Sequence, residues 1–190
     1  MRKIIAGTFI TLDGVVEAPG SADTTLPDHR GWSEPFMNEE VGNTIMSQMM
    51  ESDALLLGRM TYQDFAAFWP SMRDENPFAR QMNGITKYVV SHTLKKTDWK
   101  NSKLIQGNAM QEISRLKQQP GKNISVTGSG GLIHSLLRHD LVDELRLMVC
   151  PVILGTGKRL FNGYDARKFL QLSEAKAFAS GMVLLSYLPK

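Results

Sequence analysis

The stretch that most constrains the fold is residues 123–141, with the sequence NISVTGSGGLIHSLLRHDL. Its first five residues alternate between polar and apolar side chains as a short strand does, and residues 132–137 place leucine and isoleucine at helical spacing. The glycine-rich turn between them, residues 128–131, ends the strand and opens the helix. Such a turn directs unpaired backbone N–H groups and the positive end of a helix dipole at one point, which suits an anion such as a phosphate.

The glycines of this turn allow positive φ and a close approach of the backbone to a ligand. They do not match the dinucleotide fingerprint G-x-G-x-x-G, because its third glycine would fall at Ile133. A strand-to-helix turn that binds no ligand is therefore the alternative interpretation.

The rest of the chain alternates strands with helices as far as residue 153, and then strands follow one another. This order predicts a three-layer α/β/α domain, residues 1–190, with a mainly parallel sheet and an antiparallel C-terminal hairpin at its edge. The predicted strands are residues 3–12, 54–57, 87–90, 104–105, 123–127, 145–153, 169–176 and 182–188. The predicted helices are residues 38–51, 61–69, 77–82, 108–119 and the helix that follows the glycine turn.

Charge and composition narrow the function classes. The net charge is +3, from 22 basic and 19 acidic residues, which is too small to favour nucleic acid or a membrane surface as a partner. The N-terminus has the pattern of a first strand and not of a signal peptide. The single cysteine, Cys150, excludes an internal disulfide. We therefore expect a cytoplasmic protein. No metal site is expected, because His134 and His139 are not on one helical face.

Three predicted strands end in similar polar turns: GRMT at residues 58–61, SHT at 91–93 and GSGG at 128–131. If these strands are parallel, their turns lie along one edge of the sheet, where ligands of open α/β sheets bind. The guanidinium of Arg59 can bind a phosphate in a bidentate manner. The alternative interpretations are a helix cap for Thr61, a solvated surface side chain for Arg59 and an ordinary strand-ending turn at residues 91–93.

Several motifs together resemble those of a known family. They are ITLDG at residues 10–14, ALLLGRMTY at 54–62, KYVVSHTL at 87–94, VTGSGGLIHSLL at 126–137 and DELRLMVCPVILGTGKRLF at 143–161. In this order they resemble the dihydrofolate reductase superfamily. The resemblance is to the group similar to the C-terminal reductase domain of the bifunctional riboflavin-biosynthesis deaminase-reductase. It covers nearly the whole chain and implies a dihydrofolate reductase-like fold and an enzyme that uses NADPH.

The resemblance also implies roles for the three turns. The first and third turns would hold the phosphates of NADPH, and the turn at residues 91–93 would lie near the adenosine 2′-phosphate. The implied cofactor-binding residues are Gly58, Arg59, Thr61, Ser91, His92, Gly128, Ser129, Gly130 and Gly131. The zinc motifs of the deaminase half, P-C-x-x-C and H-x-E, are absent from this sequence.

The substrate side of the site is less well marked. The long polar segment at residues 13–36 is expected to cover nicotinamide and substrate as a mobile lid, with Trp32 and Phe36 as apolar walls. Asp13 is interpreted mainly as a turn-forming residue and also as a candidate contact to the substrate.

The catalytic group is a second open point. Dihydrofolate reductases carry a lone carboxylate on the first helix, and no residue here aligns with it. Glu39 and Glu40 are the catalytic candidates, with solvated acids in a first helical turn as the alternative.

These observations predict an NADPH-dependent reductase that transfers a hydride to a small heterocyclic (pteridine-like or pyrimidine-like) or carbonyl/imine substrate. Two alternatives stay open. One is a stand-alone 5-amino-6-(5-phosphoribosylamino)uracil reductase of riboflavin biosynthesis. The other is a non-catalytic NADP(H)-binding protein. We expect a homodimer, from the resemblance and from the apolar C-terminal strands.

Overall fold

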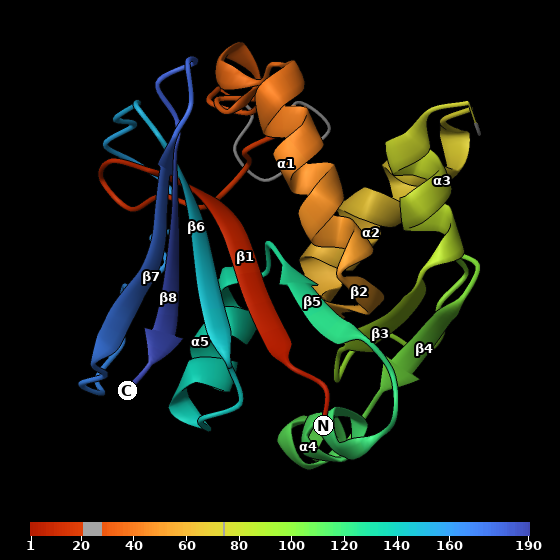
Figure 1. The fold of residues 1–190 in the computed structure, drawn as a ribbon. Helices are drawn as coiled ribbons and strands as arrows, with labels where there is room; N and C mark the ends of the chain where they lie inside the picture. Colours follow the sequence, from red (N-terminus) through yellow and green to blue (C-terminus); the bar gives the residue numbers. More distant parts are fainter. Residues whose placement is uncertain (21–27, 74) are drawn as a thin grey trace.

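The fold is built on one eight-stranded sheet, seen in a computed structural model that describes residues 1–20, 28–73 and 75–190 (Figure 1). The strand order is β4-β3-β2-β5-β1-β6-β8-β7, and β8 is antiparallel to both of its neighbours while the other pairs are parallel. The strands are β1 (Ile4–Thr11), β2 (Ser52–Gly58), β3 (Thr86–Val90), β4 (Ser102–Ile105), β5 (Asn123–Thr127), β6 (Glu144–Cys150), β7 (Leu170–Ala177) and β8 (Val183–Pro189).

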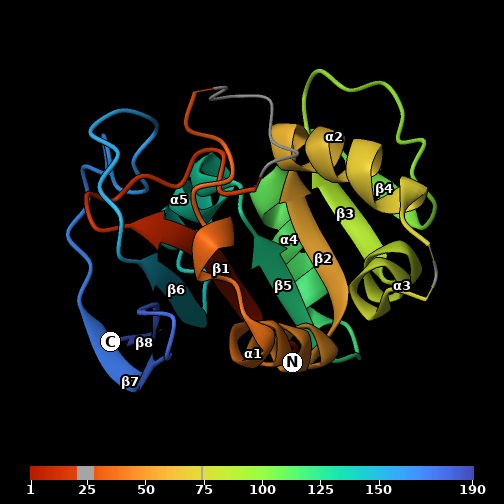
Figure 2. The same cartoon turned by 90° about the horizontal axis from the view of Figure 1, so that it is seen from above.

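Helices cover both faces of this sheet (Figures 1 and 2). One face packs against α4 and α5, and the opposite face packs against α1, α2 and α3. The bounds are α1 (Glu39–Met50), α2 (Arg59–Phe68), α3 (Pro77–Gly84), α4 (Ala109–Gln118) and α5 (Gly130–Arg138), with short 3₁₀ helices η1 (Glu34–Phe36) and η2 (Trp69–Ser71). The three-layer α/β/α prediction with an antiparallel C-terminal hairpin is confirmed.

The central strands are apolar because both of their faces are covered. In β2, Leu56 points into the core under α4 and α5, while Leu55 and Leu57 point into the core under α2 and α3. In β1, Ile4 and Ala6 join the same core as Leu56. Alternate residues of one strand thus hold the two helical layers to the sheet.

Most element boundaries differ from the prediction by one to three residues, and two of these differences have a clear physical reason. The strand β6 ends at Cys150, before Pro151, and Ile153 is 70% exposed, so the predicted strand to residue 153 is too long. Proline has no N–H group for the sheet ladder, which explains the early end. The helix α2 begins at Arg59 with Gly58 as its N-cap, so the predicted helix start and capping role at Thr61 are wrong.

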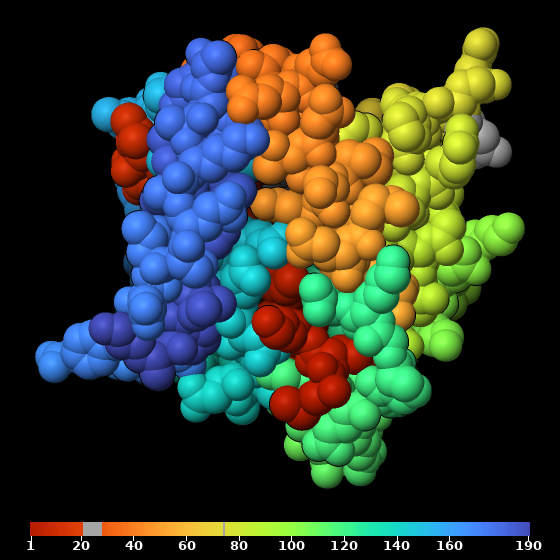
Figure 3. Space-filling view, viewed as in Figure 1, coloured from red at the N-terminus to blue at the C-terminus, as the bar shows by residue number. Residues whose placement is uncertain are grey.

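The helix α1 is fixed to the C-terminal hairpin by polar contacts. Its N-cap is Asn38, whose side chain accepts a hydrogen bond from the Val41 N–H at 2.9 Å. The Lys176 ammonium on β7 lies 3.3 Å from the Glu40 carboxylate and 3.2 Å from the Thr44 hydroxyl. In the space-filling view the C-terminal strands and α1 accordingly lie side by side (Figure 3).

None of the described helices is long and apolar enough to cross a membrane.

One buried cation fixes the start of β3. Lys87 is fully buried, and its ammonium donates hydrogen bonds to the carbonyl oxygens of Ile85 at 2.9 Å, Lys100 at 3.0 Å and Asn83 at 3.2 Å. It also lies 4.1 Å from the centre of the Trp99 ring. The ammonium thus ties together the end of α3, the start of β3 and the loop before β4. Burial lowers the pKa of Lys87 from 10.5 to about 8.

We expect Lys87→Met to destabilise the protein by about 2–4 kcal/mol, because three carbonyl oxygens lose their donor. The folded pKa lies below the unfolded one, so the unfolded chain binds more protons and the stability of the wild type rises with pH between about 8 and 10.5. The variant should lose that rise. Urea unfolding at several pH values measures both effects, with exposed Lys100→Met as control; an unchanged pH slope in the variant would contradict this role.

Candidate functional site

The three polar turns lie along one edge of the sheet. The strand β2 pairs in parallel with β3 on one side, with Gly58 opposite Val90, and with β5 on the other side, with Leu56 opposite Val126. The turns that follow β3, β2 and β5 are therefore neighbours in that order. This is the arrangement that the sequence predicted.

The side chain of Ser129 joins two of these turns. Its hydroxyl accepts a hydrogen bond from the Gly58 N–H at 2.9 Å and donates one to the Thr61 hydroxyl at 2.8 Å. The first contact closes a separation of 71 residues along the chain. It places the N-terminus of α2 beside the N-terminus of α5, so two positive helix ends converge.

The backbone of the glycine turn explains its residue choices. Gly128 has a φ of +61°, and a Cβ there would lie 3.4 Å from the Thr61 methyl group. Ser129 has a φ of 53° and a ψ of 53°, a left-handed conformation that is uncommon without glycine. Gly130 is the first residue of α5, and a Cβ there would lie 3.2 Å from Val16. A Cβ on Gly131 would meet no atom of the described residues within 4 Å beyond its own helix and chain neighbours, so that side of the turn is open among them.

The other predicted cofactor residues lie on the same edge. Arg59 is exposed at the first position of α2 and donates to the Gln63 side chain at 3.1 Å. Ser91 is buried, and its hydroxyl accepts hydrogen bonds from the backbone N–H groups of Thr93 at 3.2 Å and Leu94 at 3.0 Å. Ser91 therefore shapes its turn, while the adjacent His92 is exposed.

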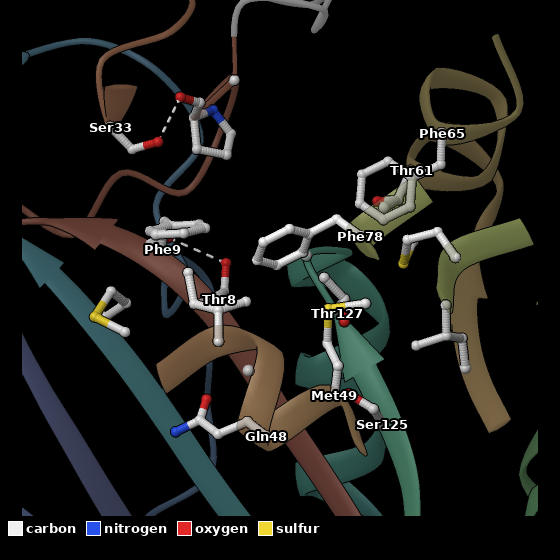
Figure 4. Close-up of a pocket in the computed structure, with 18 of the residues that line it drawn as sticks. Thr8, Phe9, Ser33, Gln48, Met49, Thr61, Phe65, Phe78, Ser125 and Thr127 are labelled. Carbon is white, nitrogen blue, oxygen red and sulfur yellow. Dashed lines mark hydrogen bonds between the residues drawn. The ribbon is translucent and has the colours of Figure 1, made fainter. Parts of the chain in front are cut away.

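A cavity of about 570 Å³ opens beside these turns, between the sheet and the helices α1, α2 and α3 (Figure 4). Its outer end is formed by Thr61, Gly128 and Ser129. From there it follows β1 and β5 toward the middle of the sheet. Its inner end is formed by Gln48, Ser52, Ser125 and Arg146. The two joined turns thus border this cavity directly.

The helix α2 supplies one wall of the cavity at helical spacing. Thr61, Asp64, Phe65 and Phe68 all line it, and they lie on one face of the helix. Phe78 of α3 projects into the same space in Figure 4. Sequence reasoning named Thr61 but missed Asp64, Phe65, Phe68 and Phe78, although the repeat of three and four along α2 was a readable sign of a common face.

The inner end of the cavity holds a charge network and one unsatisfied hydroxyl. The Arg146 guanidinium donates to the Glu144 carboxylate at 2.6 Å and to the Glu51 carboxylate at 2.9 Å. Ser52 is 5% exposed, and its hydroxyl oxygen has no hydrogen-bond partner among the described residues. A buried polar atom of this kind is costly unless a ligand or water satisfies it.

The proposed substrate residues lie outside the cavity wall as it is described. Trp32 is buried, donates from its ring nitrogen to the Glu17 carbonyl at 2.8 Å, and packs with Phe36 in the core under β6. Glu39 and Glu40 are exposed at the start of α1. The cavity face of α1 instead presents Ile45, Gln48 and Met49, and none of these three is a carboxylate.

Asp13 closes a turn. Its carboxylate accepts hydrogen bonds from the Thr11 hydroxyl at 2.6 Å and from the N–H groups of Leu154 at 3.3 Å and Gly155 at 2.9 Å. Arg159 also lies 3.3 Å from it. The hydrogen bond from Thr11 and those from the backbone lower the pKa of Asp13 from 3.8 to about 2. The carboxylate thus holds the end of β1 against residues 154–159.

The expected lid, residues 13–36, is described only in part, because residues 21–27 lie outside the described residues. Its described flanks are tied to each other. Gly31 donates from its N–H group to the Ala18 carbonyl at 3.1 Å, and the Ser33 hydroxyl donates to the Pro19 carbonyl at 2.8 Å (Figure 4).

Across the ranges 1–20, 28–73 and 75–190, no group of three or more His, Cys, Asp or Glu residues could hold a metal ion.

The fold is dihydrofolate reductase-like. The solved dihydrofolate reductase of Enterococcus faecalis, described as complexed with NADP(H), superposes with a TM-score of 0.60 at 11% identity, over 99% of this chain and 96% of that one. The match is higher for a Shewanella sp. PV-4 protein named for riboflavin biosynthesis: TM-score 0.74, 21% identity, 99% of each chain.

More specifically, residues 2–184 match the family model of the RibD C-terminal domain, and the chain belongs to that family. The protein YyaP of Bacillus subtilis is 31% identical over 190 residues, which is 98% of this chain and 94% of YyaP. YyaP is described as uncharacterized, so it supplies no function.

We expect Ser129→Ala to lower stability by about 1–3 kcal/mol, because the Gly58 N–H and the Thr61 hydroxyl both lose their partner. Chemical denaturation measures the change. The control is Ser135→Ala, which removes a hydroxyl from the same helix that bonds only within it, to the Gly131 carbonyl. Equal effects of the two substitutions would show that Ser129 does not join the turns.

Asp13 predicts a pH dependence. Its pKa is lower in the folded than in the unfolded chain, so its stabilising effect is complete above about pH 4 and is lost as the pH falls toward about 2. Carboxyl titration by NMR should place Asp13 near 2, and Asp13→Asn should flatten acid unfolding in this window. A titration near 3.8 would contradict the hydrogen-bonded turn.

Proposed function

We propose that this protein is an NADPH-dependent reductase that transfers a hydride to a small heterocyclic or carbonyl/imine substrate in the cavity. The observation that carries the proposal is the junction at Ser129, where two helix N-termini meet at the mouth of a largely apolar cavity. Membership of the RibD C-terminal domain family supports it. So does the shared fold with a dihydrofolate reductase whose structure is described with NADP(H).

The residues at this edge fit a phosphorylated dinucleotide. The first N–H groups of α2 and α5 have no partner within their own helices, and they form the positive ends of the two helix dipoles. The open side of Gly131 leaves room for a phosphate. The exposed guanidinium of Arg59 adds a charged, bidentate donor at the start of α2. In this proposal His92 and the Ser91 turn lie farther along the edge, toward the adenosine.

The cavity supplies what hydride transfer needs from a protein. Bound NADPH supplies a hydride to an electron-poor carbon. The aromatic wall of Phe9, Phe65 and Phe78 excludes water and orients a flat substrate. The neighbouring oxygen or nitrogen of the substrate must gain a proton, and Asp64 lines the cavity one helical turn after Thr61. We assign Asp64 the proton-delivering or proton-positioning role for which Glu39 and Glu40 were the sequence candidates.

We expect NADPH to bind more tightly than NADH, and Arg59→Ala to weaken NADPH binding by roughly 1.5–3 kcal/mol, which is a loss of about ten-fold to a hundred-fold. Calorimetry at low salt measures both. The control is Gln63→Ala, which removes the hydrogen-bond partner of Arg59 but keeps the guanidinium. Equal affinities for the two cofactors would show that the extra phosphate is not recognised here. An unchanged affinity of Arg59→Ala for NADPH would show that Arg59 does not bind the cofactor phosphate.

A further inference from the structure

The cavity as a whole differs chemically from the two joined turns at its mouth. Aromatic and sulfur-containing side chains dominate its walls, with Phe65, Phe78, Met49 and Met82 among them. A charged group that leaves water for such a space loses its hydration and must find a partner of opposite charge. The charges that line the cavity therefore decide which substrates can enter.

Those charges do not favour an anion. Arg146 is the one lysine or arginine among the described residues that line the cavity, and its guanidinium is already bound by Glu144 and Glu51. The acidic residues in the lining are Glu34 and Asp64. The eight residues outside the description, 21–27 and 74, contain two aspartates and no lysine or arginine.

The inner end does offer neutral hydrogen bonding. Ser52 keeps a buried hydroxyl oxygen without a partner among the described residues, and the Gln48 carboxamide and the Ser125 hydroxyl line the same region (Figure 4). A carboxamide presents one donor and one acceptor edge, and a hydroxyl can act as either. These groups match the N–H and C=O edge of an uncharged ring.

We propose that the substrate is an uncharged, flat, largely apolar molecule without a phosphate group, and that its ring N–H or C=O edge binds at Gln48, Ser52 and Ser125. The inference rests on the proposed reductase function for the reaction itself. It excludes 5-amino-6-(5-phosphoribosylamino)uracil, because its phosphate would meet no unneutralised cation inside the cavity. In this proposal the two joined turns at the mouth bind the anionic groups, and the interior of the cavity disfavours charged substrates.

Two fluorescent probes with the same ring system test this selection by binding alone. N-phenyl-1-naphthylamine is neutral, and 8-anilinonaphthalene-1-sulfonate carries an added sulfonate. In titrations of the wild-type protein we expect the neutral probe to bind roughly ten-fold more tightly. The titrations are made with saturating NADP⁺, which occupies the turns. Failure of NADP⁺ to bind would overturn the proposed function, and titration without it would then still test the cavity.

A matched pair of variants locates the effect. Met49→Lys places a cation in the cavity and should strengthen sulfonate binding by roughly ten-fold. Met50 is the next residue of α1 and is 53% exposed, so Met50→Lys adds the same charge outside and should change neither probe by more than about two-fold. Thermal unfolding checks that both variants fold.

The outcomes are clear-cut. A sulfonate that binds the wild type as tightly as the neutral probe, or a neutral probe that does not bind, overturns the inference. An equal change in sulfonate-probe affinity in Met49→Lys and Met50→Lys also overturns it. If Met49→Lys does not fold, the comparison of the two probes on the wild type decides the matter alone.

Discussion

The arrangement of this site depends on one hydroxyl group. Ser129 accepts a hydrogen bond from the Gly58 N–H and donates one to the Thr61 hydroxyl, which joins the start of α2 to the turn before α5. Because the residue lies in a left-handed conformation, its side chain can reach across to a neighbouring strand instead of capping its own helix. The positions of two helix dipoles, the mouth of the cavity and the proposed phosphate site all follow from that contact.

Local sequence rules predicted the helices and strands and the sheet edge that carries the three polar turns, because these features depend on residues that are near one another in the sequence. The strand β5 was predicted residue for residue, since the glycines of the following turn mark its end. The helix α2 was predicted two residues too late, because Thr61 has the chemistry of a helix cap while its hydroxyl serves a contact with Ser129. No local pattern reveals a partner that lies almost seventy positions farther along the chain.

The cavity could be predicted only in part. The stripe along α2 is periodic, so its common face was readable, but nothing in the sequence indicates that Phe78 of α3 closes the same space. Trp32 and Phe36 looked like ligand-binding aromatics, whereas their packing under β6 is core packing. Which apolar residues are core and which are cavity wall depends on how α1 and α3 sit on the sheet, and that is a tertiary property.

The position of β1 bears on how the chain assembles. This strand precedes the other described strands in the sequence, yet its two neighbours in the sheet are β5 and β6, so it has no partner strand until residues 123–150 have been synthesised. Until then both edges of this apolar strand are unpaired, and unpaired apolar strands are prone to incorrect pairing and aggregation. The distant pairings also slow folding, because long loops must close before these contacts form. The central strand of the finished sheet is thus the segment most in need of protection on the ribosome.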